Sequence, residues 1–114
     1  MTEPLTRGAV VWVQLDPTRG REQAGTRPAV VLSSDGYLDA VPDLAIVVPV
    51  TMRDRGWPHH IRLVGRELSL PRTSFAMTEQ PRTISRDRIS GTAGRADEAT
   101  MDAITLWIKD FVEL

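Results

Sequence analysis

The chain has 114 residues, of which 41% are apolar and 25% charged, and its net charge is −1. This composition is typical of a globular domain and too apolar for a disordered chain, so we expect a single domain over residues 1–114. The absence of cysteine excludes disulfides, thiolate metal sites and thiol nucleophiles, and with only two histidines, His59 and His60, no metal site is expected.

No apolar run approaches the roughly 20 residues that cross a bilayer, and the N-terminal segment lacks the pattern of a secretory signal, which predicts a cytoplasmic protein. Thirteen of the fourteen basic residues are arginine. A guanidinium is planar and permanently charged and suits phosphate, although a biased genome composition also favours arginine. The balanced total charge argues against a general nucleic-acid coat but leaves a local basic groove open.

Apolar, β-branched segments predict a mainly β chain. The first strand is continuous in its apolar character and is expected to be buried on both faces. Pro49 within the third strand implies a sheet edge or a bulge. The polar segments 18–26 and 51–58 are expected to be loops, and 35–43 a connector. The predicted strands are residues 9–15, 28–34, 44–50, 59–64, 74–77 and 82–84.

The end of the chain has the pattern of an amphipathic helix. Its apolar positions are three and four residues apart: Met101, Ile104, Ile108 and Phe111. Asp97 is the expected N-cap, because its carboxylate can accept from the first-turn N–H groups. Several short strands and one terminal helix, without strand–helix alternation, predict a mainly β (α+β) fold, a small barrel or curled antiparallel sheet that this helix closes.

Polar residues gather where the predicted strands end. The sequence contains no serine nucleophile elbow, phosphate-binding P-loop, zinc-protease helix motif or dinucleotide fingerprint. It offers instead guanidinium groups, amides and a hydroxyl, which suit holding a phosphate and hydrogen-bonding base edges, although strand ends are often polar without a function. The four clusters lie in residues 19–27, 51–55, 59–60 and 79–83.

A pattern runs through RGAVVWVQLDP (7–17), REQAGTRPAVVLS (21–33), VVPVT (47–51) and TEQPRTISRDRI (78–89). In order and with matching spacing, these segments resemble the MazF/PemK family of toxin endoribonucleases, and the resemblance covers about residues 7–114. It implies an SH3-like barrel of the CcdB/PemK type, a homodimer, and a toxin of a type II toxin–antitoxin system. The implied activity is metal-independent cleavage of single-stranded RNA at short sequences, giving a 2′,3′-cyclic phosphate and a 5′-hydroxyl and inhibiting translation and growth. The implied partner is an antitoxin whose C-terminal segment covers the RNA groove.

By this resemblance, Arg27 and Thr51 are the catalytic residues. The chain departs from the family pattern at Ala9, where an acidic residue is common, at Pro81, and at Met52 after the threonine; we expect these changes to alter the RNA sequence that is read rather than remove activity. The expected RNA-binding residues, from the resemblance and the basic loops, are Arg19, Arg21, Glu22, Gln23, Arg53, Arg55, Trp57, Glu79, Gln80 and Arg82.

Cleavage through the 2′-hydroxyl needs a proton removed there, charge stabilised on the phosphoryl oxygens and a proton given to the leaving 5′-oxygen. Arg27 can clamp the phosphate but is an awkward base, and Thr51 can hydrogen-bond a phosphoryl oxygen or relay a proton. We therefore expect both to act mainly by binding the transition state. A histidine is the alternative proton shuttle. Adjacent strand residues point to opposite faces, so at most one of His59 and His60 should face a groove. A surface or packed histidine is the simpler interpretation.

The three tryptophans invite different interpretations. Trp12 and Trp107 are expected in core or dimer packing. Trp57, in the basic loop, either stacks an RNA base or anchors an antitoxin side chain, or else packs as part of a lid. Two other functions stay open, because a fold alone does not decide function: a CcdB-like poison of DNA gyrase and a non-catalytic SH3-like interaction module.

Overall fold

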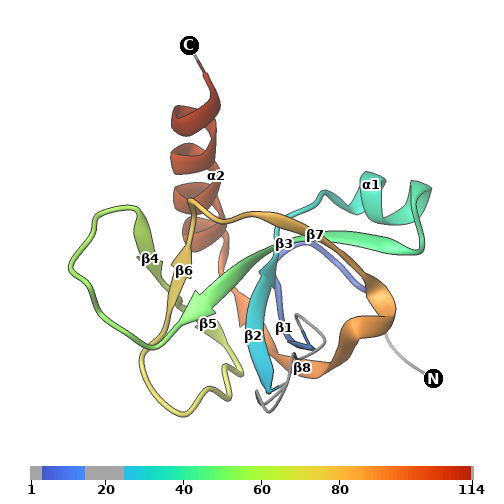
Figure 1. Cartoon of the computed structure of the whole chain (residues 1–114), viewed down its shortest axis with the longest axis horizontal. Coiled ribbons are helices and arrows are strands. Elements are labelled where there is room, and N and C mark those ends of the chain that lie inside the picture. The colour runs from blue at the N-terminus through green and yellow to red at the C-terminus, as the bar shows by residue number, and fades with distance from the viewer. Residues whose placement is uncertain (1–3, 15–24, 114) are drawn as a thin grey trace, which may run out of the picture.

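The computed structural model describes residues 4–14 and 25–113, and Figure 1 shows the course of the chain. Within these residues the protein is a curled antiparallel sheet of eight strands with a long helix at its C-terminal end. No helix in the described ranges is both long and apolar enough to span a bilayer. The elements are, in chain order, β1 (Ala9–Gln14), β2 (Thr26–Val31), α1 (Asp35–Ala40), β3 (Leu44–Thr51), β4 (His60–Arg62), β5 (Gly65–Arg66), β6 (Phe75–Met77), β7 (Arg82–Ser85), the short 3-10 helix η1 (Arg86–Arg88), β8 (Ile89–Ala96) and α2 (Glu98–Val112).

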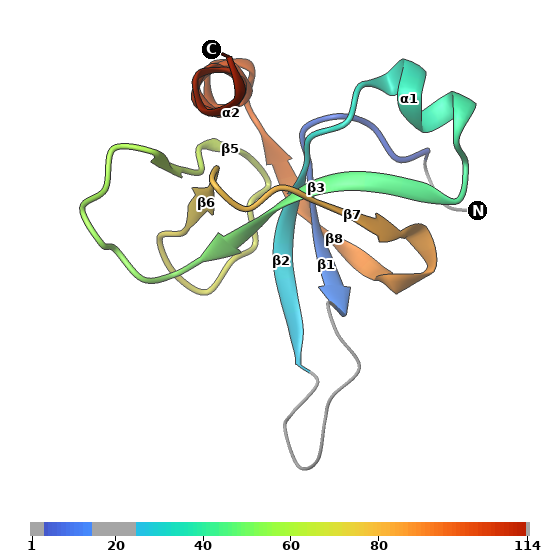
Figure 2. The same cartoon turned by 45° about the horizontal axis from the view of Figure 1, so that its top comes forward.

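The sheet divides at strand β3. The strand order is β4-β6-β3-β2-β1-β8-β5, and β7 also pairs with β3. One side of β3 pairs with β2; on the other side, residues from Leu44 to Val47 pair with β7, and Val50 and Thr51 pair with β6. Figure 2 shows β6 and β7 on either side of the middle of β3. The long central strand therefore belongs to both wings of the sheet.

Pro49 marks the point where β3 changes its neighbour. It pairs with Ala29 of β2, and together with Val48 it lies between the residues that pair with β7 and those that pair with β6. A proline has no N–H to donate to a ladder, so it is tolerated where the ladder is interrupted. The expectation of a sheet edge or a bulge at Pro49 is therefore wrong: β3 is central, and the interruption is a change of partner.

The central strands are buried on both faces. Val10 and Val11 belong to two different hydrophobic clusters, because successive side chains of a strand point to opposite faces. Helix α2 covers one cluster with Met101 and Ile104, and Leu38 of α1 packs into the other. This confirms the prediction of a first strand buried on both faces.

Helix α2 begins where the sequence predicts it. Asp97 is the N-cap, and its carboxylate accepts hydrogen bonds from the Thr100 hydroxyl (2.6 Å) and the Thr100 N–H (2.9 Å). These two bonds stabilise the ionised form and hold the pKa of Asp97 below its ordinary value. Met101 and Ile104 are buried, whereas Phe111 at the end of the expected apolar stripe is 43% exposed, so the last turn leaves the core.

Besides the short elements β5 and η1, one helix and one strand were not predicted from the sequence. The segment 35–43, expected to be a connector, contains helix α1, which Ser34 caps by accepting a hydrogen bond from the Tyr37 N–H (3.1 Å). Strand β8 is not apparent from the sequence, because ISGTAGRA contains two glycines and no sustained apolar alternation. It forms because β1 provides a partner along its length, which is a tertiary effect rather than a local preference.

Two glycines let the short strand β5 approach β8. A Cβ atom on Gly65 would lie 1.8 Å from the Arg95 carbonyl oxygen, and one on Gly94 would lie 2.4 Å from the Glu67 carbonyl oxygen. Gly94 also has a φ of +107°, which residues with a side chain rarely adopt. Glycine is therefore required at both positions by the closeness of the two backbones.

Replacing Gly94 by alanine is expected to lower the free energy of unfolding by about 2–4 kcal/mol, because the new methyl group clashes with the Glu67 backbone and strains φ. Gly91→Ala on the same strand is the control: nothing lies within 4 Å of its added Cβ, and the change should stay below about 1 kcal/mol. Urea unfolding followed by circular dichroism measures both. Equal effects of the two substitutions would contradict the close approach of β5 to β8.

Replacing Asp97 by alanine should lower the melting temperature, because the first turn of α2 loses its acceptor. The pKa of Asp97 is lowered on folding, so its contribution is present above the ordinary value of 3.8 and is lost as the pH falls through the lower folded value. The difference in melting temperature between wild type and Asp97→Ala should therefore be full near pH 7 and shrink below about pH 4. Asp110→Ala, at an exposed position of α2, is the control. If the melting temperatures of wild type and Asp97→Ala differ by the same amount from pH 7 down to about pH 3, Asp97 does not cap the helix through its ionised carboxylate.

Candidate functional site

A cavity of about 660 Å³ opens where β2 begins and β3 ends. Two arginines and no acidic residue line it within the described part of the chain. Such a cavity favours an anion, because the guanidinium charges face it without a carboxylate to neutralise them. The lining residues that carry the argument are Trp12, Arg27, Thr51, Arg53, Leu70 and Ser74.

The pairing of β2 with β3 places Arg27 beside Thr51. The two strands are antiparallel and Ala29 pairs with Pro49, so two residues further on Arg27 is level with Thr51. Both residues line the cavity. The structure thus brings together the two residues that the family resemblance implies as catalytic, and their catalytic role stays a prediction.

The Thr51 hydroxyl is oriented by a short turn after β3. It accepts a hydrogen bond from the Arg53 N–H at 3.1 Å, which holds Arg53 at the cavity as well. Within residues 4–14 and 25–113 the hydroxyl makes this one hydrogen bond. Its proton is therefore free to be donated to a ligand in the cavity.

Trp12 is a lining residue that the sequence analysis assigned to the core or a dimer interface. It is half-buried: it packs against the cluster beneath α2 and also lines the cavity. The strand register explains this position, because Trp12 pairs with Pro28, the neighbour of Arg27, and the sequence alone does not show that register. Leu70 and Ser74 come from the segment between β5 and β6, and neither was singled out by the sequence analysis.

Apart from Arg53, none of the predicted RNA-binding residues that the structure describes lines this cavity. Arg19, Arg21, Glu22 and Gln23 lie outside the residues that the structure describes. Gly25 and Thr26, which follow them, line the cavity. Arg82 begins β7 opposite Val47 and is not part of the cavity lining. Arg55, Trp57, Glu79 and Gln80 belong to a second group of side chains.

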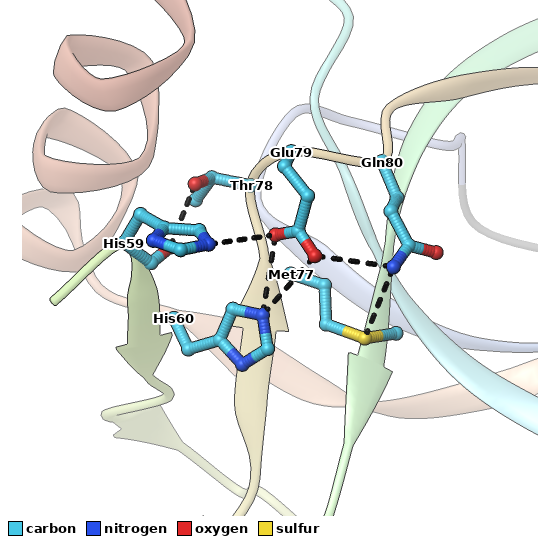
Figure 3. Close-up of polar contacts among 6 residues, drawn as sticks. All are labelled: His59, His60, Met77, Thr78, Glu79 and Gln80. Atoms are coloured by element: carbon cyan, nitrogen blue, oxygen red, sulfur yellow. Dashed lines mark hydrogen bonds and ion pairs between the residues drawn. The ribbon is translucent and has the colours of Figure 1, made fainter. Parts of the chain in front are cut away.

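This second group lies where β4 meets the turn between β6 and β7 (Figure 3). The Nε2 atoms of His59 and His60 are 3.4 Å and 3.2 Å from Glu79 Oε1. The Thr78 hydroxyl donates to the His59 carbonyl oxygen at 2.6 Å, and Gln80 Nε2 donates to Glu79 Oε2 at 3.1 Å. We call His59, His60 and Glu79 the histidine–glutamate cluster.

Both histidine rings turn toward Glu79, so the premise that these adjacent residues point to opposite faces does not hold here (Figure 3). That expectation placed the two residues in one strand, but β4 begins at His60 and His59 belongs to the preceding turn, where strict alternation does not apply. The His60 side chain is only 2% exposed, which agrees with a packed histidine. Its Nδ1 has no hydrogen-bond partner among the described residues.

Glu79 is the anionic member of the cluster. Burial raises the pKa of Glu79, but hydrogen bonds from its own backbone N–H, from His60 and from Gln80 lower it by more. The pKa of Glu79 therefore lies below its ordinary value of 4.5, and the carboxylate is ionised at neutral pH. An ionised carboxylate can accept N–H groups of a base edge or hold a cation.

Trp57 packs over the two histidines. Its ring stacks on His59, with 5.5 Å between centroids and 16° between planes, and meets the His60 ring edge at 4.9 Å. The Arg55 guanidinium carbon lies 4.9 Å from the centroid of the Trp57 ring, a cation–π contact. The indole is still 45% exposed, so it packs as a lid on the histidines and also presents a free surface.

The chain matches, over residues 6–112, the family described as "PemK-like, MazF-like toxin of type II toxin-antitoxin system". The chain belongs to this family. It is 40% identical over 78 residues to the endoribonuclease toxin MazF of Escherichia coli strain K12, which covers 68% of this chain and 66% of that protein. It is 30% identical over 102 residues to the endoribonuclease EndoA of Bacillus subtilis, which covers 88% of this chain and 87% of EndoA.

Solved structures of MazF toxins share the fold of this chain. In a MazE–MazF crystal structure from Deinococcus radiodurans, a chain 25% identical in sequence superposes with a TM-score of 0.83 over 99% of each chain. The predicted mostly β, curled sheet with a C-terminal helix, of the CcdB/PemK type, is confirmed. The predicted class of enzyme is confirmed as well, because the curated relatives are named endoribonucleases.

Thr78→Val is expected to lower the free energy of unfolding by about 1–3 kcal/mol, because it removes the donor to the His59 carbonyl at a position that is fully buried. Thr83→Val, at an exposed position of β7, is the control and should change the stability by less than about 0.5 kcal/mol. Urea unfolding followed by tryptophan fluorescence measures both free energies. If Thr78→Val is as stable as Thr83→Val, the bond does not hold the β4 turn in place.

Proposed function

We propose that this chain is the toxin of a type II toxin–antitoxin system and acts as a metal-independent, sequence-specific endoribonuclease on single-stranded RNA. The observation that carries the proposal is that Arg27 and Thr51, from two neighbouring strands, line one cavity together with Arg53 and without an acidic residue among the described ones. The endoribonuclease names of the relatives from Escherichia coli and Bacillus subtilis support the same class of reaction.

In the proposed reaction the ribose 2′-oxygen attacks the neighbouring phosphorus and the bond from phosphorus to the 5′-oxygen breaks. The products are a 2′,3′-cyclic phosphate and a 5′-hydroxyl, after the 2′-hydroxyl has lost a proton and the leaving oxygen has gained one. Negative charge builds up on the phosphoryl oxygens during this step. The cavity offers cationic donors at the place where that charge would develop.

Arg27 is assigned to the phosphoryl oxygens. Its guanidinium has no hydrogen-bond or ion-pair partner among the described residues, so it is available for a bidentate contact with phosphate. Thr51 donates its free hydroxyl proton to the same group while its oxygen stays bound to the Arg53 N–H. The described lining contains no imidazole and no carboxylate, so we assign most of the rate enhancement to charge stabilisation.

The RNA itself would extend from the cavity toward the second group of side chains. Trp12 lies beside Arg27 and offers an aromatic ring next to the scissile phosphate, and Trp57 has an exposed face backed by Arg55. Glu79 and Gln80 supply acceptors and donors for base edges in single-stranded RNA. We assign these residues, with Arg82 and the loop residues 19–23, to binding the bases and the backbone around the cut.

The proposed partner is a cognate antitoxin. MazF of Deinococcus radiodurans was crystallised together with MazE, and a mycobacterial endoribonuclease of similar fold was solved in complex with its cognate antitoxin. For this chain we propose a homodimer in the cytoplasm whose RNA groove is covered by a C-terminal segment of the antitoxin. Release of that segment would allow cleavage, which would inhibit translation and growth.

The test of this proposal is to incubate the purified protein with a long RNA in EDTA and to map the cut ends. Cuts at one short sequence, ending in a cyclic phosphate, are the expected result. Intact RNA would overturn the nuclease proposal and leave two alternatives, the gyrase poison and the interaction module. A supercoiling assay distinguishes them, because only a gyrase poison slows DNA gyrase.

Arg27→Ala is expected to lower kcat/KM for RNA cleavage by about 10²–10³-fold, because a cationic donor to the transition state is lost. Thr51→Val should lower it by about 10²-fold through loss of the hydroxyl. Arg27→Lys should fall between wild type and Arg27→Ala, since an ammonium keeps the charge without the fork.

Arg66→Ala, on β5 and outside this cavity, is the matched control and should stay within about threefold of the wild-type rate. A cleavage assay on one fluorescent oligonucleotide that contains the mapped sequence gives the rates of the wild type and the four variants, and circular dichroism shows that the variants are folded. Wild-type activity in Arg27→Ala would remove Arg27 from the mechanism.

A further inference from the structure

We propose that the histidine–glutamate cluster of His59, His60 and Glu79 binds a divalent transition-metal ion, with Zn²⁺ as the preferred one. The site lies outside the cavity that holds Arg27 and Thr51 and does not depend on the proposed RNA cleavage. Composition alone predicts no zinc site in a chain without cysteine, because two histidines are too few ligands. The fold brings the carboxylate of Glu79, from a distant segment, to the histidines as the third ligand.

The three ligand atoms converge on one point although they come from two parts of the chain. His59 and His60 are adjacent at the start of β4, and Glu79 follows β6, to which β4 is paired through His60 and Met77. One ligand atom from each of the three side chains lies within 4.8 Å of the other two, and both Nε2 atoms are turned toward the Glu79 carboxylate (Figure 3). Among the described residues this is the only group of three such side chains.

The spacing of the atoms is also compatible with ligands around one metal ion, and without an ion His60 Nε2 is hydrogen-bonded to Glu79 Oε2 at 3.2 Å. The Nε2 atoms of His59 and His60 are 3.4 Å and 3.2 Å from Glu79 Oε1. Charge-assisted N–H···O bonds are about 2.7–2.9 Å long, so both contacts are long for ion-paired hydrogen bonds. Two ligands bound about 2.0–2.1 Å from a tetrahedral zinc ion lie about 3.4 Å apart, which is close to the spacing observed.

The chemistry of the ligands selects the class of metal. Two imidazole nitrogens and one carboxylate oxygen form a set that Zn²⁺ accepts, with water or another ligand in the fourth position. Mg²⁺ and Ca²⁺ prefer sites made of oxygen ligands and are disfavoured here.

The neighbours of the cluster hold the ligands in place. The His59 carbonyl is tied to the Thr78 hydroxyl, the His59 ring is stacked under Trp57, and the His60 side chain is almost fully buried. His60 Nδ1 has no partner among the described residues, and a ligand histidine without a partner on its second nitrogen typically loses 10–100-fold in affinity. We therefore expect weaker binding than at a closed four-ligand zinc site.

A bound ion would clamp the turn before β4 to the turn after β6. Because it binds the folded chain and not the unfolded one, it should raise the melting temperature as its concentration rises above the dissociation constant. The experiment uses full-length protein without a polyhistidine tag, freed of metal with EDTA and then desalted. ZnCl₂ is titrated in by calorimetry, and the melting temperature is recorded with ZnCl₂ and with MgCl₂.

We expect one Zn²⁺ to bind per chain and ZnCl₂ to raise the melting temperature. MgCl₂ should leave the melting temperature unchanged. His59→Gln and Glu79→Gln, the two more exposed ligands, should each weaken Zn²⁺ binding by at least about tenfold. Glu113→Gln, an exposed carboxylate outside the cluster, is the matched control and should bind as wild type does. In protein with ¹⁵N-labelled histidine, Zn²⁺ should move both Nε2 signals.

Absence of Zn²⁺ binding by the wild-type protein at a tenfold molar excess would overturn the proposal. Equal affinity in wild type, His59→Gln, Glu79→Gln and Glu113→Gln would overturn it too, because the ion would then be bound elsewhere. RNA cleavage is measured separately, on the wild-type protein in EDTA, so absence of Zn²⁺ binding would not count against the proposed nuclease, and absence of cleavage would not count against the metal site.

Discussion

The missing N–H of one proline, at Pro49 inside the central strand, is the constraint on which the arrangement of the molecule depends. Before Pro49, β3 pairs with β7; after it, β3 pairs with β6. The chain must therefore cross from β6 to β7 at this interruption, and the crossing turn carries Glu79 to the histidines of β4. Beyond the interruption β3 continues to Thr51, level with Arg27. The cavity and the histidine–glutamate cluster are thus two results of one change of partner.

The structure also divides the many arginines into two kinds. Arg86 is part of the framework, because it donates to the Leu44 carbonyl at 2.9 Å and to two further backbone carbonyls. Arg95 likewise donates to the Thr6 hydroxyl and the Arg7 carbonyl. Arg27 and Arg53 instead line a cavity that no acidic residue enters within the described part of the chain. Composition cannot make this distinction, since it depends on what each guanidinium meets after folding.

The elements that the sequence predicts well are those whose own residues carry the pattern. β1 is an unbroken apolar run, and α2 has its cap at Asp97 and its apolar residues on one stripe. β8 is missed because its glycines and polar residues suit a strand only beside β1, and α1 is missed because a six-residue helix is too short for a periodic signal. The orientation of His59 is not predicted either, because strand β4 starts one residue later, at His60, and the alternation of a strand does not apply to His59.

By itself the sequence determined the fold class and the family resemblance, and it identified Arg27 and Thr51 as candidate catalytic residues. It could do so because side-chain periodicity and short motifs are local properties of segments of about ten residues. Only the tertiary structure decided that these two share a cavity with Trp12, and that His59, His60 and Glu79 meet at a different place. The physical reason is that strand register and the meeting of distant turns are set by long-range pairing and packing, which no single segment encodes.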